Sequence, residues 1–280
     1  LAAGSFVSSI HRILVPVRGK ENVIQSAHMI QQLASHQDLS VTLLQVTEET
    51  KASKSSPLLD EVSRLFPSVE LVKKVVPSGN VAEAILNEAK KDYDLIMLGA
   101  SERDTSSEVL FSPLVDYVVR LAPCATMVVR GRTGMEPERI DHILVPTNGS
   151  EASRHAAELA FTLAHGHDTT VTVLNVIQAE MGTEGYDYRL NAEQRRIAFA
   201  HQIVEELRVL GEARDVHTDT EVRHGEVLSD QVATLAERLH TDLIILGTDL
   251  RPGSERLYFG PRVERILDEV SCPVVIFNVT

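Results

Sequence analysis

The chain has 280 residues, of which 43% are hydrophobic, 24% are charged and only 4% are aromatic. At roughly 150 residues per domain this length predicts two domains, each large enough to fold without disulfides or a structural metal. The net charge of −13 repels polyanions and argues against general nucleic-acid binding. The charge is uneven, since residues 1–139 carry −2 and residues 140–280 carry −11.

No stretch approaches the roughly 18 consecutive apolar residues of a membrane span, and the first residues do not form a signal peptide. The sequence therefore predicts a soluble, cytoplasmic chain. Leu1 in place of an initiator methionine favours a processed chain or a fragment of a longer protein, and the remnant of a tag would look the same. Cys124 and Cys272 lack the spacing of redox or zinc motifs, so we expect two small core residues and no metal.

The sequence contains an internal duplication. The run His11–Gly19 returns as Asp141–Gly149, 130 residues later, and Tyr93–Gly99 returns as Thr241–Gly247, 148 residues later. The 18 additional residues fall after Val176, in a segment that continues into a long helical pattern. A repeat of this length indicates two tandem copies of one domain.

Each copy alternates short apolar runs with segments of helical periodicity, which predicts parallel strands joined by crossover helices. The runs are nearly continuous, as is typical of strands covered on both faces. In the second copy we predict strands at 142–147, 170–177, 217–223, 242–248 and 273–279. The predicted fold class is α/β, with two tandem doubly wound, parallel, five-stranded sheets and helices on both faces.

The ends of the predicted elements place the domain boundary and one helix cap. We divide the chain into a first domain at 1–135 and a second at 136–280, with a linker in the Gly- and Pro-containing run 131–137. A helix is predicted from about 151 to 164 with Ser150 as its N-cap, a signal that the first copy lacks after Gly19.

We expect a ligand site at the carboxyl ends of the second copy's strands, where ligands bind in open α/β sheets. Gly260-Pro261 begins a helix whose N-terminus attracts anions, and four of the twelve arginines of this half fall within 251–265. The glycines there allow a close backbone approach. The alternative is a solvated loop and helix face with Arg–Glu pairs. The candidate binding residues are Pro146, Thr147, Asn148, Val176, Gly247, Thr248, Arg251, Gly253, Gly260, Pro261 and Arg262.

Three features of the chain resemble the universal stress protein family. They are the Ile-Leu-Val-Pro run that opens each half, the Leu-Gly strand end with its Gly-containing loop, and the closing Cys-Pro-Val-Val. The resemblance covers nearly the whole chain as two tandem domains, and it implies the fold of the adenine nucleotide alpha-hydrolases. The family's nucleotide-binding members carry an Asp after the first strand and a Gly-x2-Gly-x9-Gly-Ser/Thr loop around the phosphates.

In the second copy Asn148 stands at the position of that Asp, and the loop maps to Gly247-x2-Leu250-x9-Gly260-Pro261. The resemblance thus implies AMP or ATP as ligand, and Leu250 and Pro261 favour a ligand with fewer phosphates than ATP because Pro261 lacks an N–H donor. In the first copy the marked positions hold Arg18, Glu102 and Ser112-Pro113, so we expect that site to be empty.

The predicted function is that of a regulatory stress-response module that binds an adenine nucleotide in its second domain. The alternatives are a tandem scaffold that binds no nucleotide, and a weak ATPase. We expect no catalytic residue, because the sequence has neither a nucleophile elbow nor a P-loop, and the pair His165 and His167 is typical of a helix end.

The resemblance also implies partners. The run from Arg251 to Pro261 resembles the tandem stress-protein regions at the cytoplasmic end of some bacterial cation/proton antiporters, which implies control of an attached membrane transporter and a position at the membrane through a preceding domain. Family members commonly pair their fifth strands, so we expect an intrachain pseudo-dimer between 125–129 and 274–277. Association into homo-oligomers through other surfaces stays open, and we expect no nucleic-acid partner.

Overall fold

The computed structural model describes residues 6–48, 56–100, 111–131, 139–178, 186–225, 227–248 and 261–279. The chain forms two compact units, and the division does not follow the halves strictly. One unit comprises Leu1–Glu136 together with Thr248–Tyr258 and Val275–Thr280, and the other comprises Pro137–Gly247 and Phe259–Val274. The end of the last strand therefore belongs to the unit that the first half builds.

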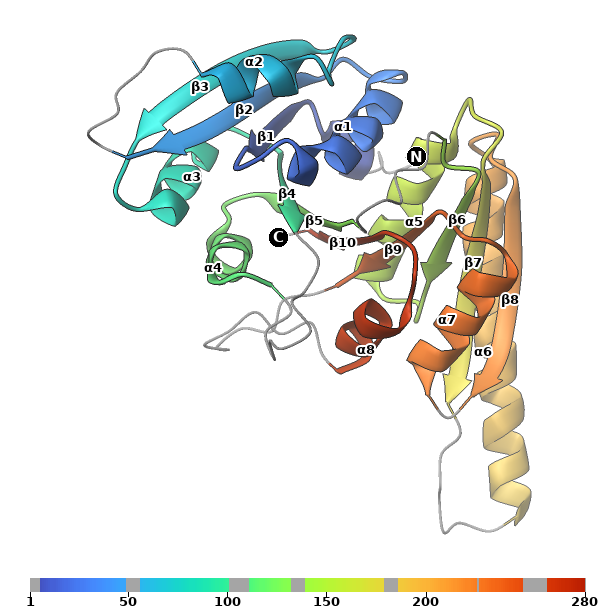
Figure 1. Cartoon of the computed structure of the whole chain (residues 1–280). Helices are drawn as coiled ribbons and strands as arrows, with labels where there is room; N and C mark the ends of the chain where they lie inside the picture. Colours follow the sequence, from blue (N-terminus) through green and yellow to red (C-terminus); the bar gives the residue numbers. More distant parts are fainter. Residues whose placement is uncertain are drawn as a thin grey trace. The chain divides into compact units, whose positions relative to one another are not determined.

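The first half alternates strands and helices (Figure 1). A short 3-10 helix at Phe6–Ser9 comes before β1, Arg12–Pro16. The elements that follow are α1 Glu21–Ala34, β2 Ser40–Thr47, α2 Pro57–Ser63, β3 Glu70–Pro77, α3 Val81–Ala89, β4 Leu95–Ala100, α4 Pro113–Leu121 and β5 Ala125–Arg130.

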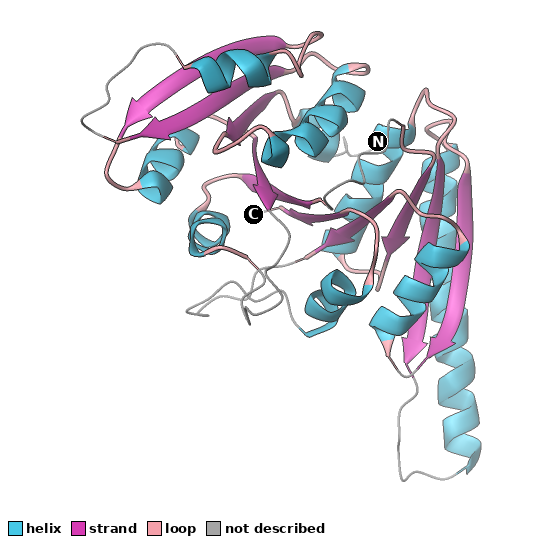
Figure 2. Ribbon diagram, in the orientation of Figure 1, coloured by secondary structure: helices cyan, strands magenta, loops and turns pink. Residues whose placement is uncertain are grey.

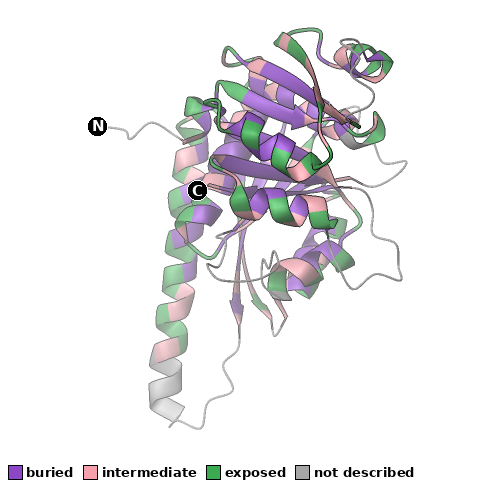
Figure 3. Ribbon diagram, turned by 90° about the vertical axis from the view of Figure 1, so that its left-hand side faces the viewer, coloured by how far each residue is buried: buried purple, intermediate pink, exposed green. Residues whose placement is uncertain are grey.

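The second half repeats this order with one much longer helix. That helix, α6, spans Tyr186–Glu212. It carries both exposed and buried residues along its length (Figure 3). The remaining elements are β6 His142–Pro146, α5 Glu151–Ala164, β7 Thr170–Gln178, β8 Thr218–Gly225, α7 Leu228–Arg238, β9 Leu243–Gly247, α8 Pro261–Glu269 and β10 Val274–Asn278.

Both halves have the same strand order. It is β3-β2-β1-β4-β5 in the first unit, where β10 lies next to β5, and β8-β7-β6-β9 in the second. The pairs β1–β2, β2–β3, β1–β4 and β4–β5 are parallel, as are β6–β7, β7–β8 and β6–β9. In the second half α5 packs with α6, and α7 packs with α8, on opposite faces of the strands (Figure 2). This is the doubly wound arrangement that the sequence predicts, and the predicted fold class is confirmed.

The predicted elements of the second copy agree with the structure to within one or two residues. Helix α5 has the predicted bounds, and Ser150 caps it, because its Oγ accepts a hydrogen bond from the backbone N–H of Ser153 at 3.3 Å. Lys20, at the corresponding start of α1, makes no side-chain cap hydrogen bond. The middle residues of the central strands are apolar and buried, as Ile143, Leu144 and Val145 of β6 illustrate. Burial of this apolar surface is the main force that holds the layers together.

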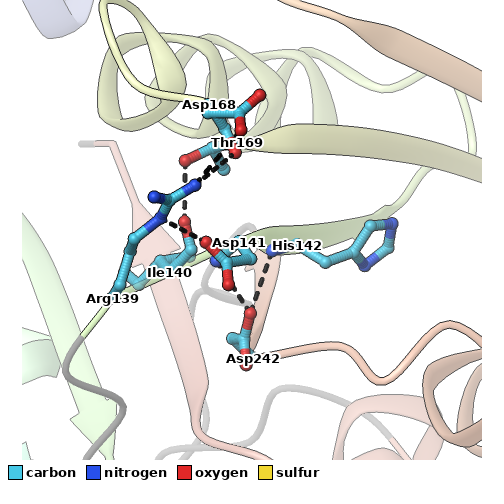
Figure 4. Close-up of polar contacts among 7 residues, drawn as sticks. All are labelled: Arg139, Ile140, Asp141, His142, Asp168, Thr169 and Asp242. Atoms are coloured by element: carbon cyan, nitrogen blue, oxygen red, sulfur yellow. Dashed lines mark hydrogen bonds and ion pairs between the residues drawn. The ribbon is translucent and has the colours of Figure 1, made fainter.

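One acidic residue of each copy fixes the start of its first strand. Asp242 Oδ2 accepts hydrogen bonds from the backbone N–H groups of Asp141 and His142 at 2.8 and 2.9 Å (Figure 4). Asp94 Oδ2 does the same for His11 and Arg12, at 2.8 Å each. The Asp-Leu-Ile motif that repeats in the sequence is therefore structural, because its carboxylate satisfies two backbone donors that the sheet leaves unpaired.

Candidate functional site

The loop after β6 is held by its own hydroxyl groups. The backbone N–H of Thr147 donates to the carbonyl of Leu174 at 2.8 Å, which continues the pairing of β6 with β7 beyond Pro146. The buried Thr147 Oγ1 lies 2.9 Å from Ser153 Oγ and accepts the N–H of Gly149 at 3.2 Å. Asn175 Nδ2 donates to the Thr147 carbonyl at 2.9 Å. The backbone N–H, the carbonyl and the hydroxyl of Thr147 thus all form hydrogen bonds within the second unit.

Asn148, the next residue of this loop, is exposed. Its Oδ1 accepts a hydrogen bond from the backbone N–H of Ser150 at 3.0 Å. An asparagine carries an acceptor oxygen with two lone pairs and an NH2 donor, so this hydrogen bond uses only part of the capacity of Asn148. A carboxylate at this position would offer acceptors only.

Helix α6 packs directly against the same loop. Gly149 has φ +80°, and a Cβ placed there would lie 2.8 Å from Ile203 Cδ1. A groove of about 630 Å³ runs beside this contact, between the loop with the start of α5 on one side and Phe199, Ile203 and neighbouring residues of α6 on the other. Sequence analysis missed this role of α6. The only signal was the 18-residue increase in the repeat offset.

Gly247 has a packing role that the sequence did not indicate. A Cβ at this position would lie 1.8 Å from the carbonyl oxygen of Ala152, so the first turn of α5 occupies the space that the glycine opens. The close approach at Gly247 is thus made by a helix. The next residue, Thr248, is 6% exposed, and its Oγ1 has no hydrogen-bond partner in the described part of the chain. A buried hydroxyl without a partner is costly, and it is available to a ligand or a water molecule.

The start of α8 lies near the end of β7. Helix α8 begins at Pro261, as predicted, and the exposed Arg262 donates from Nη2 to Gln178 Oε1. Val176 is half-buried two residues earlier on β7. The structure therefore brings the ends of β6, β7 and β9 and the start of α8 to one edge of the second unit. Arg251, Gly253 and Gly260, together with Leu250, lie outside the described residues.

Within the described ranges, no group of three His, Cys, Asp or Glu side chains lies close enough to hold a metal ion. Cys124 is half-buried just before β5, and burial raises the pKa of its thiol to about 11, which suppresses the thiolate. His165 ends α5 as predicted, with Nδ1 2.7 Å from the carbonyl of Arg214. Among the described helices none is long and apolar enough to cross a bilayer.

The doubly wound repeat defines the class of protein, and sequence comparison identifies the family. The model of the universal stress protein family matches residues 9–130 and again residues 139–278. The chain therefore belongs to the universal stress protein family and is a tandem member with two such domains. The resemblance predicted from the repeated motifs is confirmed.

Individual relatives match either most of this chain or about half of it. The universal stress protein E homolog of Haemophilus influenzae is 24% identical over 219 residues, which cover 74% of this chain and 69% of that protein. A universal stress protein of Methanocaldococcus jannaschii is 28% identical over 138 residues, or 48% of this chain and 79% of that protein.

Solved structures share the fold over nearly the whole length. A universal stress protein from Archaeoglobus fulgidus superposes with a TM-score of 0.62 at 16% identity, covering 95% of this chain and 97% of that one. A functionally unknown protein from Pseudomonas aeruginosa gives a TM-score of 0.66 at 16% identity, with coverage of 99% and 95%. At such low identity these similarities establish the fold alone.

Proposed function

We propose that this chain is a regulatory module that binds one adenine nucleotide at the carboxyl edge of its second domain, without using it as a substrate. The observation that carries the proposal is the presence of Asn148 and Arg262, both exposed, at the edge where β6 and β7 end and α8 begins. Asn148 offers an amide donor to a ribose hydroxyl, and Arg262 offers a guanidinium to a phosphate. Val176 supplies an apolar contact for the base.

We infer that the ligand carries few phosphates, with AMP favoured over ATP. The positive end of the α8 dipole attracts an anion. The first residue of α8 is Pro261, which has no N–H and so removes one of the donors that a helix N-terminus normally offers. A triphosphate needs more hydrogen-bond donors than a monophosphate, so we expect ATP to bind more weakly than AMP.

Thermal unfolding with and without nucleotide tests the proposal. A ligand at 100 times its dissociation constant stabilises the native state by about 2.7 kcal/mol, so AMP in excess raises the Tm. Arg262→Ala reduces this shift. Arg265→Ala, an exposed position one turn further along α8, is the matched control and leaves the shift unchanged. If no adenine nucleotide moves the Tm, the chain is a scaffold. If phosphate release from ATP is measurable and is lost in Gly260→Val, it is a weak ATPase.

The setting of the module is proposed from the resemblance of the run 251–261 to antiporter-linked stress-protein regions. In that setting the chain acts on the cytoplasmic side of a membrane and biases an attached cation/proton antiporter. Regulation of this kind requires that the nucleotide binds two states of the protein with different affinity. We also propose the intrachain pseudo-dimer, which is supported by the position of β10 next to β5 in the first unit.

A further inference from the structure

The amino ends of the strands, opposite the edge discussed above, can be compared residue by residue between the two copies. The backbone N–H of Ser40 donates to the His11 carbonyl at 2.8 Å, and that of Thr170 donates to the Asp141 carbonyl at 2.9 Å. These equivalent hydrogen bonds fix the correspondence at an offset of 130 residues. By this offset His11 corresponds to Asp141, Asp38 to Asp168, and Ser9 to Arg139.

In the second copy this place is occupied by a guanidinium group. Arg139 lies between two acidic residues and forms an ion pair with each of them, Asp141 and Asp168 (Figure 4). Its Nη2 is 3.4 Å from Asp168 Oδ2 and donates to the backbone carbonyl of Asp168 at 3.3 Å. Helix α5 ends at Ala164, shortly before these residues, and the carbonyls of a helix C-terminus favour a cation.

In the first copy the corresponding place is a cavity of about 700 Å³. Its lining includes Asp38, which stands where Asp168 stands, and a second carboxylate, Glu70 on β3. Ala34, the last residue of α1, also lines it, so the helix C-terminus is present as well. Ser9 is too short to reach in as Arg139 does. Of the two carboxylates that pair with Arg139, the first copy retains one, as Asp38, and His11 stands in place of the other.

Arg12 and His11 also line this cavity. Arg12 is engaged elsewhere, because its Nη1 donates to the Asp92 carbonyl at 3.1 Å and its guanidinium lies 5.0 Å from the centre of the Tyr93 ring. His11 Nδ1 lies 3.4 Å from the Asp38 carbonyl. Asp38 and Glu70 are exposed, and neither forms an ion pair with another described residue, so both carboxylates can accept from a ligand.

We propose that this cavity is a binding site for a guanidinium group, with Asp38 as its principal acceptor. Two parallel N–H donors of a guanidinium match a carboxylate in a way that a lysine ammonium does not. The second copy shows the arrangement already filled by a side chain of the chain itself. The ligand of the first copy is either a free guanidino compound or an arginine side chain of another polypeptide, and both present the same planar group.

Titration of the 15N-labelled protein, followed by NMR, tests this site. Arginine amide is the probe for a free guanidino compound, a capped Gly-Arg-Gly peptide is the probe for an arginine in a polypeptide, and lysine amide is the control ligand. We expect saturable shifts of the amides of Asp38, Ser40 and Glu70 with both arginine probes, and at least tenfold weaker binding of lysine amide. Tighter binding of the peptide identifies a polypeptide partner, and tighter binding of arginine amide identifies a small molecule.

Three variants make the test specific. Asp38→Asn weakens binding at least tenfold, whereas Glu83→Gln, an exposed carboxylate of α3 in the same domain, leaves it unchanged. His11→Asp restores the second carboxylate of the other copy and tightens binding. Ser9→Arg supplies the guanidinium within the chain and abolishes binding. The proposal is overturned if the arginine probes cause no saturable shift, or if Asp38→Asn and Ser9→Arg both bind as the unmodified chain does.

Discussion

The two copies have the same order of strands and helices, but different side chains form the hydrogen bonds between equivalent elements. In the first copy the buried carboxylate of Glu88 is paired with Lys74 at 2.6 Å and Lys91 at 2.9 Å, and it accepts from the Tyr93 hydroxyl at 3.1 Å. The Tyr93 oxygen also lies 3.0 Å from Thr42 Oγ1 and accepts from that hydroxyl, because its own hydrogen is donated to Glu88. The first copy therefore stabilises this region with a network of charged and phenolic groups.

The second copy has a single imidazole in the comparable region. His142 Nε2 lies 2.9 Å from Thr172 Oγ1, and Nδ1 lies 3.0 Å from Thr241 Oγ1. The residues that meet here correspond to Arg12, Thr42 and Tyr93 of the first copy. Duplication thus preserved the hydrogen bonds that organise the backbone, such as those of Asp94 and Asp242, and left the side chains between strands free to diverge. Both proposed ligand sites include positions at which the copies differ, such as Asn148 against Arg18 and Ser9 against Arg139.

The largest expected effect tests what the copies share. Asp94→Ala and Asp242→Ala each leave two backbone N–H groups without their carboxylate, and each should lower the free energy of unfolding of its own copy by about 3–5 kcal/mol. Chemical denaturation with hydrogen-exchange readout for each copy checks this. Asp219→Ala, an exposed acid on β8, serves as control. A loss below 1 kcal/mol in both variants would show that the repeated motif does not hold the strands.

The next effect tests where the copies differ, at the glycine after the first strand. Gly149→Ala should destabilise by about 2–3 kcal/mol, because its φ is positive and Ile203 fills the space that a methyl group needs. At the matched position of the first copy, Gly19→Ala meets no atom within 4 Å and should be nearly neutral. Equal effects of the two substitutions would contradict the packing of α6 on the loop after β6.

A smaller effect is expected at the helix start that follows each loop. Ser150→Ala removes the hydrogen bond to Ser153 N–H and should cost about 1 kcal/mol. Lys20→Ala removes no cap, because Lys20 makes none, and loses only a surface ion pair with Glu61. Urea unfolding of both variants measures the difference. A cost at Lys20 as large as that at Ser150 would be evidence against capping as the distinction.

The smallest effect concerns how the stability of each copy depends on pH in the acidic range. Burial lowers the pKa of His142 below its ordinary value of 6.5, so the folded second copy favours neutral imidazole and its stability begins to fall as the pH drops through that value. Burial alone would raise the pKa of Glu88, but hydrogen bonds from Lys74 and Lys91 outweigh it and hold the pKa below the ordinary 4.5.

The ion pairs of Glu88 therefore stabilise the first copy fully until the pH falls below 4.5, the ordinary pKa of a glutamate. On acidification the amides of the second copy should lose hydrogen-exchange protection at a higher pH than those of the first. His142→Gln should remove the pH dependence of the second copy's stability just below pH 6.5. An unchanged slope in that variant would assign the acid sensitivity to other groups.

The sequence predicted most of the local structure and little of the contact between distant elements. The apolar runs, the Ser150 cap and Pro261 at the start of α8 could be located because each depends on neighbouring residues. The packing of Ile203 on Gly149, and of Ala152 on Gly247, could not, because these contacts join segments far apart in the sequence. The hydroxyl contacts of Thr147 are local in sequence, but they depend on the turn geometry of the loop, which the residue pattern alone does not specify.

The central claim is that the second copy holds an adenine nucleotide and the first does not. Isothermal titration of AMP into the whole chain, repeated with Asn148→Ala and with Arg18→Ala at the matched position of the first copy, tests it most directly. We predict one site per chain, weakened by Asn148→Ala and unaffected by Arg18→Ala. Two sites per chain, or AMP binding that only Arg18→Ala weakens, would contradict it.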